Sequence, residues 1–139
     1  DREVMANYIF GLPGEDLNSI KRTFDLSLKL NTSGWNAYAA MALPGSKLYK
    51  EAIEKNYKLP ESYSGYSFHS YDTQPLPTDF LTAAEILEFR DNAFNQYHKN
   101  QKFLDRIRNK FGDKAVKNIN EMTKVSLKRK IIEEKHNSE

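Results

Sequence analysis

The sequence predicts an α/β fold, and two observations carry that prediction. The first is a repeated pattern in which an apolar segment runs into Leu-Pro-Gly and then into a helical pattern, at residues 4–30 and again at 35–56. The second is the helical composition of residues 82–139. Two strand-to-helix units with short connections predict parallel strands joined by right-handed crossovers, as in open α/β sheets and barrels.

Composition limits the chain to one domain and narrows its partners. Its 139 residues are 39% hydrophobic, which is enough for one core. Because the chain has 21 basic and 19 acidic residues, its net charge is only +2, and no overall electrostatic field favours binding to nucleic acid or to an anionic membrane. The absence of cysteine excludes disulfides, thiolate zinc sites and a cysteine nucleophile. With no bilayer-spanning segment, signal-peptide core or initiator Met, we expect a cytoplasmic chain cut from a longer protein.

The first strand-to-helix unit is the clearest local pattern. Residues 4–10 have the apolar and aromatic content of a buried strand, and Gly-Leu-Pro-Gly turns the chain directly after them. Apolar residues then recur at helical spacing up to Leu30. Asp16 is a suitable N-cap for this helix, and Asn31–Gly34 supplies residues that end it.

The second unit repeats the first with smaller residues. Residues 35–43 alternate in a way that predicts a strand, and many of them are small. One face would carry Trp35, Ala37, Ala39, Met41 and Leu43, and the other Asn36, Tyr38, Ala40 and Ala42. Small residues either let a ligand come close or simply fit a crowded core. Pro44-Gly45 turns the chain and Ser46 caps a short helix. The alternative for the repeat is that both turns serve only as helix entries.

The remainder of the chain predicts an irregular segment followed by three helices. Residues 57–77 indicate irregular chain with one strand near 66–71, and their aromatic side chains are suited to covering the open end of a sheet. Thr82–Glu85 is a capping box that begins the first helix. The second helix is expected to stop at Gly112, and the third to run from Asp113 into the C-terminal sequence "LKRKIIEEK".

We assign no function to two features that could be mistaken for functional sites, the three histidines and a basic cluster. His69, His98 and His136 are far apart in sequence and have no metal-ligand spacing, so we interpret them as surface or hydrogen-bonded residues. The basic cluster Lys128–Lys130 is followed at once by two glutamates and has no interleaved aromatic residues. We therefore expect no nucleic-acid partner.

Three sequence segments resemble a known family. "YIFGLPGED" and, about thirty residues later, "MALPGSKLYKEAIEKN" resemble the second half of the radical S-adenosylmethionine (SAM) barrel. The tail "LTAAEILEFRDNAFNQYHKNQKFLDRIRNKFGDKAVKNI" resembles the segment after the barrel in cobalamin-binding-type radical SAM proteins. The resemblance covers nearly the whole chain. Asp16 and Ser46 depart from it, since each stands where the family usually has Thr, but both keep an oxygen that can cap a helix.

The resemblance implies a fold and a division of the chain. Residues 1–81 would be the C-terminal part of a partial TIM-type (β/α) barrel, and residues 82–139 a helical C-terminal extension. Because the chain has no cysteine, the family's three-cysteine loop, and with it the ligands of the [4Fe–4S] cluster, would lie outside it. The implied partner is the upstream half of the same barrel.

The resemblance also implies a reaction. The intact enzyme would cleave SAM reductively at the [4Fe–4S] cluster to a 5′-deoxyadenosyl radical, which abstracts hydrogen from a small-molecule or biosynthetic-intermediate substrate. This chain alone would be inactive. The subgroup implies a cobalamin-binding domain upstream, while the substrate and the use of cobalamin stay open.

The resemblance places a cofactor site at the two Leu-Pro-Gly turns. Ile9 would lie against the adenine, Gly11 would leave room for the cofactor, and Met41–Pro44 would pass near the adenine edge. Glu15 would either reach a polar group of SAM or favour the helix N-terminus. If φ of Gly11 is negative, we expect Gly11→Val to fold and to lose mainly SAM binding. The expected cofactor-binding residues are Ile9, Phe10, Gly11, Leu12, Pro13, Glu15, Leu43 and Pro44.

A barrel cut before its fifth strand would leave an open parallel edge. We therefore expect either a homodimer or a rearranged terminus that covers residues 4–10. A second hypothesis, from a different class of function, is a non-catalytic α/β module that binds a protein partner. A three-cysteine loop upstream in the full reading frame would decide for the enzyme.

Overall fold

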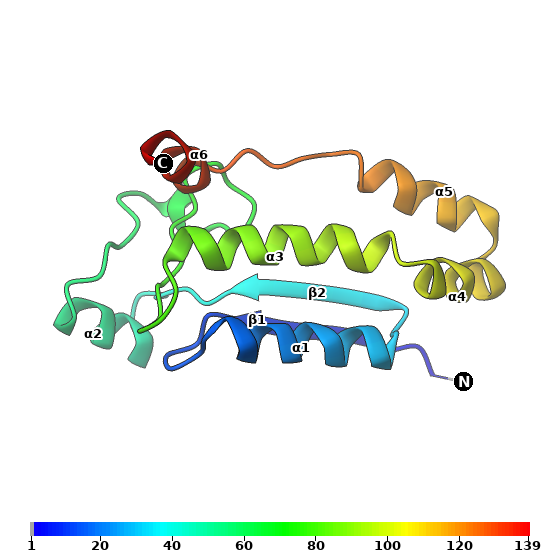
Figure 1. Ribbon diagram of the computed structural model, residues 1–139, viewed down its shortest axis with the longest axis horizontal. Helices are drawn as coiled ribbons and strands as arrows, with labels where there is room; N and C mark the ends of the chain where they lie inside the picture. The colour runs from blue at the N-terminus through cyan, green and yellow to red at the C-terminus, as the bar shows by residue number, and fades with distance from the viewer. Residues whose placement is uncertain (1) are drawn as a thin grey trace.

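The computed structural model describes residues 2–139 and has a mixed α/β fold whose C-terminal half is helical (Figure 1). This confirms the predicted α/β class. The described residues form one two-stranded parallel sheet and no barrel. The elements are β1 (Met5–Phe10), α1 (Leu17–Leu30), β2 (Gly34–Ala39), α2 (Lys47–Glu54), the 3₁₀ helix η1 (Tyr63–Tyr66), α3 (Ala83–His98), α4 (Gln101–Phe111), α5 (Asp113–Met122) and α6 (Lys130–Ser138).

The sheet is covered on one face only. The strands pair in a register that runs from Met5 opposite Gly34 to Phe10 opposite Ala39. Helices α1 and α3 both pack on the face that carries Phe10 and Trp35. In Figure 1, α1 runs below β2 and α3 above it. The side chains on the opposite face of β1, including Ile9, are exposed. Parallel sheets are usually covered on both faces, so this exposed face is the unusual feature of the fold.

The core lies between the covered face of the sheet and the helices. Aromatic rings dominate it: Trp35 stacks on Tyr97 of α3 with ring centroids 5.2 Å apart, and Phe10 meets Phe89 edge to face at the same distance. The buried apolar residues of this core are Phe10, Ile20, Phe24, Trp35, Ala37, Ala39, Ile86, Leu87, Ala93, Tyr97, Phe103, Ile107 and Val116. The predicted strands and the C-terminal helices therefore share one core.

Caps confirm the predicted start and end of α1, the predicted start of α3 and the predicted end of α4. The Asp16 carboxylate accepts a hydrogen bond from the backbone N–H of Ser19 at 2.7 Å, and Asn31 ends α1 in the left-handed conformation at φ 46°. Thr82 and Glu85 form the expected capping box. Gly112 ends α4 with φ 83°.

Three predicted boundaries are wrong. The second strand ends at Ala39 instead of running to residue 43, because the chain leaves the sheet before the Leu-Pro-Gly turn. Residues 66–71 are not a strand: Tyr66 ends η1, and residues 67–71 form irregular chain, turns and bends outside the two-stranded sheet. The helix expected from Asp113 to the C-terminal sequence is two helices, separated by a non-helical segment over residues 123–129. That segment connects α5 to α6 (Figure 1), and Arg129 at its end donates a hydrogen bond to Asp91 of α3.

The two outer edges of the sheet differ. At β2, the Arg90 guanidinium of α3 donates its Nε–H to the carbonyl oxygen of Ala37 at 2.7 Å. Beyond the end of β2, the backbone N–H of Leu76 donates to the carbonyl of Ala40 at 2.9 Å. No strand within residues 2–139 pairs with the outer edge of β1. The edge of β2 is thus partly covered and that of β1 is open.

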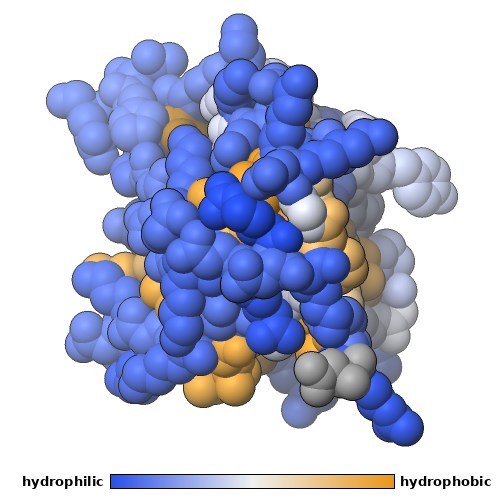
Figure 2. All heavy atoms as spheres, turned by 90° about the vertical axis from the view of Figure 1, so that its right-hand side faces the viewer, coloured by the Kyte–Doolittle hydropathy of each residue, from blue (hydrophilic) through white to orange (hydrophobic). Residues whose placement is uncertain are grey.

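The end of the molecule at α4 and α5 lies away from the Leu-Pro-Gly turns. Seen from that end, the surface is mainly hydrophilic, with smaller hydrophobic areas between the charged side chains (Figure 2). The candidate site lies at the opposite end, where the strands reach their carboxyl termini.

Candidate functional site

The two Leu-Pro-Gly segments form the same turn. In the first, the Glu15 N–H donates to the carbonyl of Leu12 at 3.0 Å, with Gly14 at φ 82°. In the second, the Ser46 N–H donates to the carbonyl of Leu43 at 3.0 Å, with Gly45 at φ 86°. Proline followed by a glycine at positive φ defines a type II turn. Each turn leads into a helix that a side chain caps, so the helix-entry role in the sequence prediction is confirmed for both.

Glu15 has a role that the sequence prediction missed. Its Oε2 accepts hydrogen bonds from the backbone N–H groups of Gly11 and Leu12, each at 2.9 Å. The N-terminus of α1 is capped by Asp16 instead. The carboxylate therefore holds the first turn closed on itself, and this arrangement differs from both alternatives considered for it.

Gly11 is required by the protein fold itself. Its φ is 86°, and a Cβ built there would lie 2.8 Å from Cγ2 of Ile86 in α3. The space beside Gly11, which was expected to serve the cofactor, is thus filled by a core side chain. The condition of negative φ does not hold, so we now expect Gly11→Val to destabilise the fold.

Three of the predicted residues meet in an apolar groove. Ile9 comes from the end of β1, Leu12 from the first turn and Leu43 from the second, and 49%, 40% and 48% of their surfaces are exposed. The groove has a volume of about 190 Å³. Its other lining residues are Tyr38, Ala39, Ala40, Met41, Leu48 and Phe68. It lies at the carboxyl ends of parallel strands, where α/β proteins usually bind ligands.

The other predicted residues do not line this groove. The side chain of Phe10 is fully buried in the core, and Gly11 and Glu15 are occupied by the contacts described above. Pro13 and Pro44 are exposed and shape the turns without lining the groove. The structure thus brings together one part of the predicted set and assigns structural roles to the rest.

Two aromatic residues that the prediction did not include form a wall of the groove. Tyr38 lies opposite Ile9 in the sheet register, on the exposed face. Phe68 comes from the irregular segment after η1 and packs against Tyr38, with ring centroids 4.7 Å apart and planes tilted by 50°. The strand alternation predicts that Tyr38 and Trp35 lie on different faces of the same strand. The aromatic composition of residues 57–77 predicts that this segment covers the open end of the sheet. Neither pattern could specify that the two rings meet.

On the exposed sheet face, the side chains next to the groove toward the N-terminal ends of the strands are polar. The Asn36 Nδ2 donates to Oδ1 of Asn7 at 3.3 Å, one register step below Ile9 and Tyr38 on this face. Met5 lies a further step below, beside the Asn36 side chain. The face thus changes from apolar at Ile9 to amide at Asn7, two residues earlier in β1.

The groove has the chemistry of a binding site without its own acid or base. Tyr38 is the one titratable side chain among its lining residues. The most buried histidine, His98, lies in the core, where its Nδ1 is 2.8 Å from the carbonyl of Phe94 and burial lowers its pKa. No cluster of metal-ligating side chains occurs within residues 2–139. The lining residues are suited to holding a flat apolar group and to excluding water from it.

The geometry so far defines a class: an α/β chain with an apolar groove at the carboxyl end of a parallel sheet. Comparison of the chain with protein-family models, with curated proteins and with solved structures finds no match. Among the described helices, none has the length and apolar character needed to cross a bilayer.

Proposed function

We propose that the groove holds the adenine of SAM in an intact radical SAM enzyme, to which this chain contributes the last strands of the barrel and a helical extension. One observation carries the proposal. Ile9, Leu12 and Leu43, from the two motifs that resemble the family's SAM pocket, converge on a single apolar groove at the carboxyl ends of parallel strands.

The lining residues fit the adenine better than they fit the whole cofactor. Ile9 and Leu43 offer apolar contact to a flat ring, and the aromatic pair of Tyr38 and Phe68 borders the same space. The volume of about 190 Å³ is below the roughly 300–1,000 Å³ of ordinary small-molecule pockets. The ribose and methionine of SAM would therefore need walls from outside this chain.

The exposed sheet face supports the barrel part of the proposal. In a (β/α) barrel the helices lie outside and one sheet face lines the interior. Here α1 and α3 cover one face, and the face with Asn7, Ile9 and Tyr38 is exposed. In the proposal, the open edge of β1 pairs with the preceding strand of the barrel, while β2 is the last strand. SAM would supply the 5′-deoxyadenosyl group, and the ligands of the [4Fe–4S] cluster and any cobalamin domain would lie outside this chain.

The second candidate function is a non-catalytic module that binds a protein. The open edge of β1 and the exposed face beside it favour this candidate, because a partner strand could pair there. It differs from the first candidate in needing no adenine site. The same binding experiment therefore separates the two.

The test is titration of the chain with SAM and with adenosine, followed by NMR of its methyl groups. We expect binding weaker than micromolar, with shifts at Ile9, Leu12 and Leu43. Leu43→Ser should reduce the shifts, while Ile53→Ser should leave them unchanged, because Ile53 is 53% exposed and does not line the groove. Shifts scattered over the surface, or none at the groove, would reject the adenine site and favour the protein-binding module.

In an intact protein that carries this chain, the measurement is 5′-deoxyadenosine formation from SAM. We expect Leu43→Ser to raise the SAM concentration needed for half-maximal rate, with Ile53→Ser again as the control. Equal SAM dependence in both variants would contradict the assignment of the groove.

A further inference from the structure

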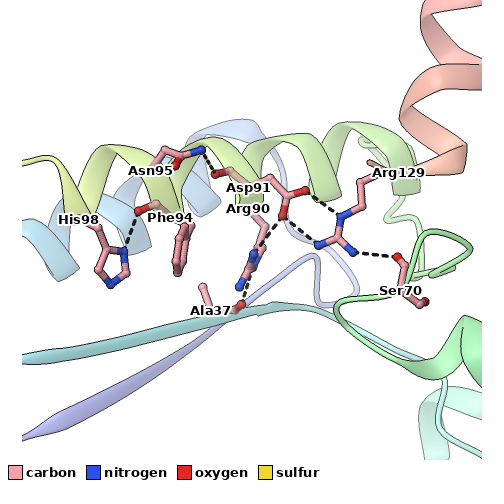
Figure 3. A network of polar contacts seen from close by, with 8 residues as sticks. All are labelled: Ala37, Ser70, Arg90, Asp91, Phe94, Asn95, His98 and Arg129. Carbon is pink, nitrogen blue, oxygen red and sulfur yellow. Dashed lines mark hydrogen bonds and ion pairs between the residues drawn. The ribbon is translucent and has the colours of Figure 1, made fainter. Parts of the chain in front are cut away.

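A half-buried carboxylate on α3, that of Asp91, connects two distant segments of the chain. Asp91 accepts two hydrogen bonds from the guanidinium of Arg129, one from Nε at 2.9 Å and one from Nη2 at 3.2 Å (Figure 3). The remaining Nη1 of Arg129 donates to the carbonyl of Ser70 at 3.0 Å. Arg129 is 2% exposed. The C-terminal segment is thus joined through one buried side chain both to α3 and to the loop that contains Ser70.

The same carboxylate is joined to β2. Arg90 donates from Nη1 to Oδ1 of Asp91 at 3.0 Å and from Nε to the carbonyl of Ala37 at 2.7 Å. Figure 3 shows Arg90 reaching down from α3 to the strand while Arg129 approaches Asp91 from the other side. One aspartate therefore lies between two guanidinium groups that hold different backbone carbonyls.

Each of these carbonyls lies close in sequence to one ring of the groove wall. Ala37 precedes Tyr38 in β2, and Ser70 follows Phe68 by two residues. Tyr38 and Phe68 are the two rings that pack together beside the groove. We propose that Asp91 is a positioning residue: through Arg90 and Arg129 it fixes both rings and so sets the shape of the groove. The proposal rests on the proposed function in treating the groove as a ligand site.

Burial of the two arginines makes the arrangement sensitive to the loss of Asp91, which pairs with both. Charge-assisted hydrogen bonds with good geometry restrict both partners, and removal of one partner leaves the other charge unpaired. Arg90 is 7% exposed, so neither arginine can turn to bulk water without moving the chain around it. Tyr71 adds a bond from the same loop to α6, since its hydroxyl donates to Glu133 at 2.8 Å. Loss of Arg129 is therefore expected to loosen the loop without releasing it fully.

The test compares three variants of the whole chain by hydrogen exchange and by the NOE between the rings of Tyr38 and Phe68. Arg129→Gln should speed exchange of amides 66–72 by about tenfold or more and weaken the NOE. Arg90→Gln should act instead on the amides of β2. Asp91→Asn should show both changes, and adding Arg129→Gln to it should add little.

Glu88→Gln is the matched control. Glu88 also joins α3 to α6, through Lys135 at 2.9 Å and His136 at 3.1 Å, but it has no bond to the loop or the strand. It should leave the ring NOE and the exchange of residues 66–72 unchanged. If Asp91→Asn raises exchange evenly over the chain, or leaves the NOE intact, Asp91 has only a general structural role and the proposal is overturned.

Adenosine titration of the same variants separates this proposal from the proposed function. If the wild-type chain binds adenosine at the groove, Asp91→Asn should weaken that binding and Glu88→Gln should not. If the wild-type chain shows no adenosine shifts at the groove, the adenine site fails, while the NOE and exchange data still decide whether Asp91 positions the rings.

Discussion

The two Leu-Pro-Gly turns share a sequence and a backbone geometry, but their surroundings differ. The first is held from two sides: Ile86 packs against Gly11, and the Glu15 carboxylate binds two backbone amides within the turn. The second has its own turn hydrogen bond and the Ser46 cap. The motif therefore determines the shape of a turn, while neighbouring elements determine how much stability depends on it.

The largest effect is expected for Gly11→Val. Positive φ in a β-branched residue costs roughly 1–3 kcal/mol, and overpacking against Ile86 adds roughly 1–3 kcal/mol. Gly14→Val is the matched variant, because Gly14 also has positive φ but a Cβ there meets nothing within 4 Å. Urea unfolding should show the greater loss for Gly11→Val.

The difference between those two variants has a direct check. If contact with Ile86 is its cause, Ile86→Ala should reduce the extra cost of Gly11→Val in a double-mutant cycle. Equal destabilisation by Gly11→Val and Gly14→Val would remove the distinction between the two turns.

The next largest loss of stability is expected when the side chains of Glu15 and Ser46, which bind backbone N–H groups at the two turns, are removed. Glu15→Ala removes two hydrogen bonds to a charged acceptor and is expected to cost about 1–3 kcal/mol. Ser46→Ala removes one cap bond, from the Tyr49 N–H at 3.1 Å, and should cost about 1 kcal/mol. Thermal unfolding of the two variants gives the comparison. A smaller loss for Glu15→Ala than for Ser46→Ala would show that the first turn is not held more firmly.

A smaller and symmetrical effect is expected for Gly14→Ala and Gly45→Ala. Both glycines have positive φ, and a Cβ at either position meets no atom within 4 Å. Each change should cost about 1 kcal/mol, since only the left-handed conformation is penalised. Denaturant midpoints that differ clearly between the two would contradict the equivalence of the turns.

The smallest effect on stability is expected for Leu12→Ser and Leu43→Ser. Both side chains are substantially exposed, so each change should alter the free energy of unfolding by about 0.5 kcal/mol or less. Both should weaken adenosine binding at the groove. A strong loss of stability without a change in binding would identify these residues as structural.

Local signals predicted the first half of the fold well. About fifteen neighbouring residues contain the apolar strand, the turn and the Asp16 cap. Each of these forms through contacts between residues close in sequence. The Thr82 capping box was predictable for the same reason. The break after α5 was not, because it depends on Arg129 meeting Asp91, which lies 38 residues earlier in the chain.

The candidate site was predictable in position but not in detail. The turns placed Ile9, Leu12 and Leu43 near one another because the carboxyl ends of adjacent parallel strands lie together. The positive φ of Gly11 and its contact with Ile86 depend on the packing of α3, which no pattern near Gly11 specifies. Phe68 reaches the groove through an irregular segment whose path has no periodic signal.

The covering of β2 by Arg90 has a consequence for stoichiometry. With that edge partly covered, the sheet formed by the described residues has one fully open edge, that of β1. Two copies that met through it would use the same edge on each side, in a two-fold arrangement with no edge left for a third. Any pairing of copies through this edge would therefore end at the dimer and would not extend into filaments.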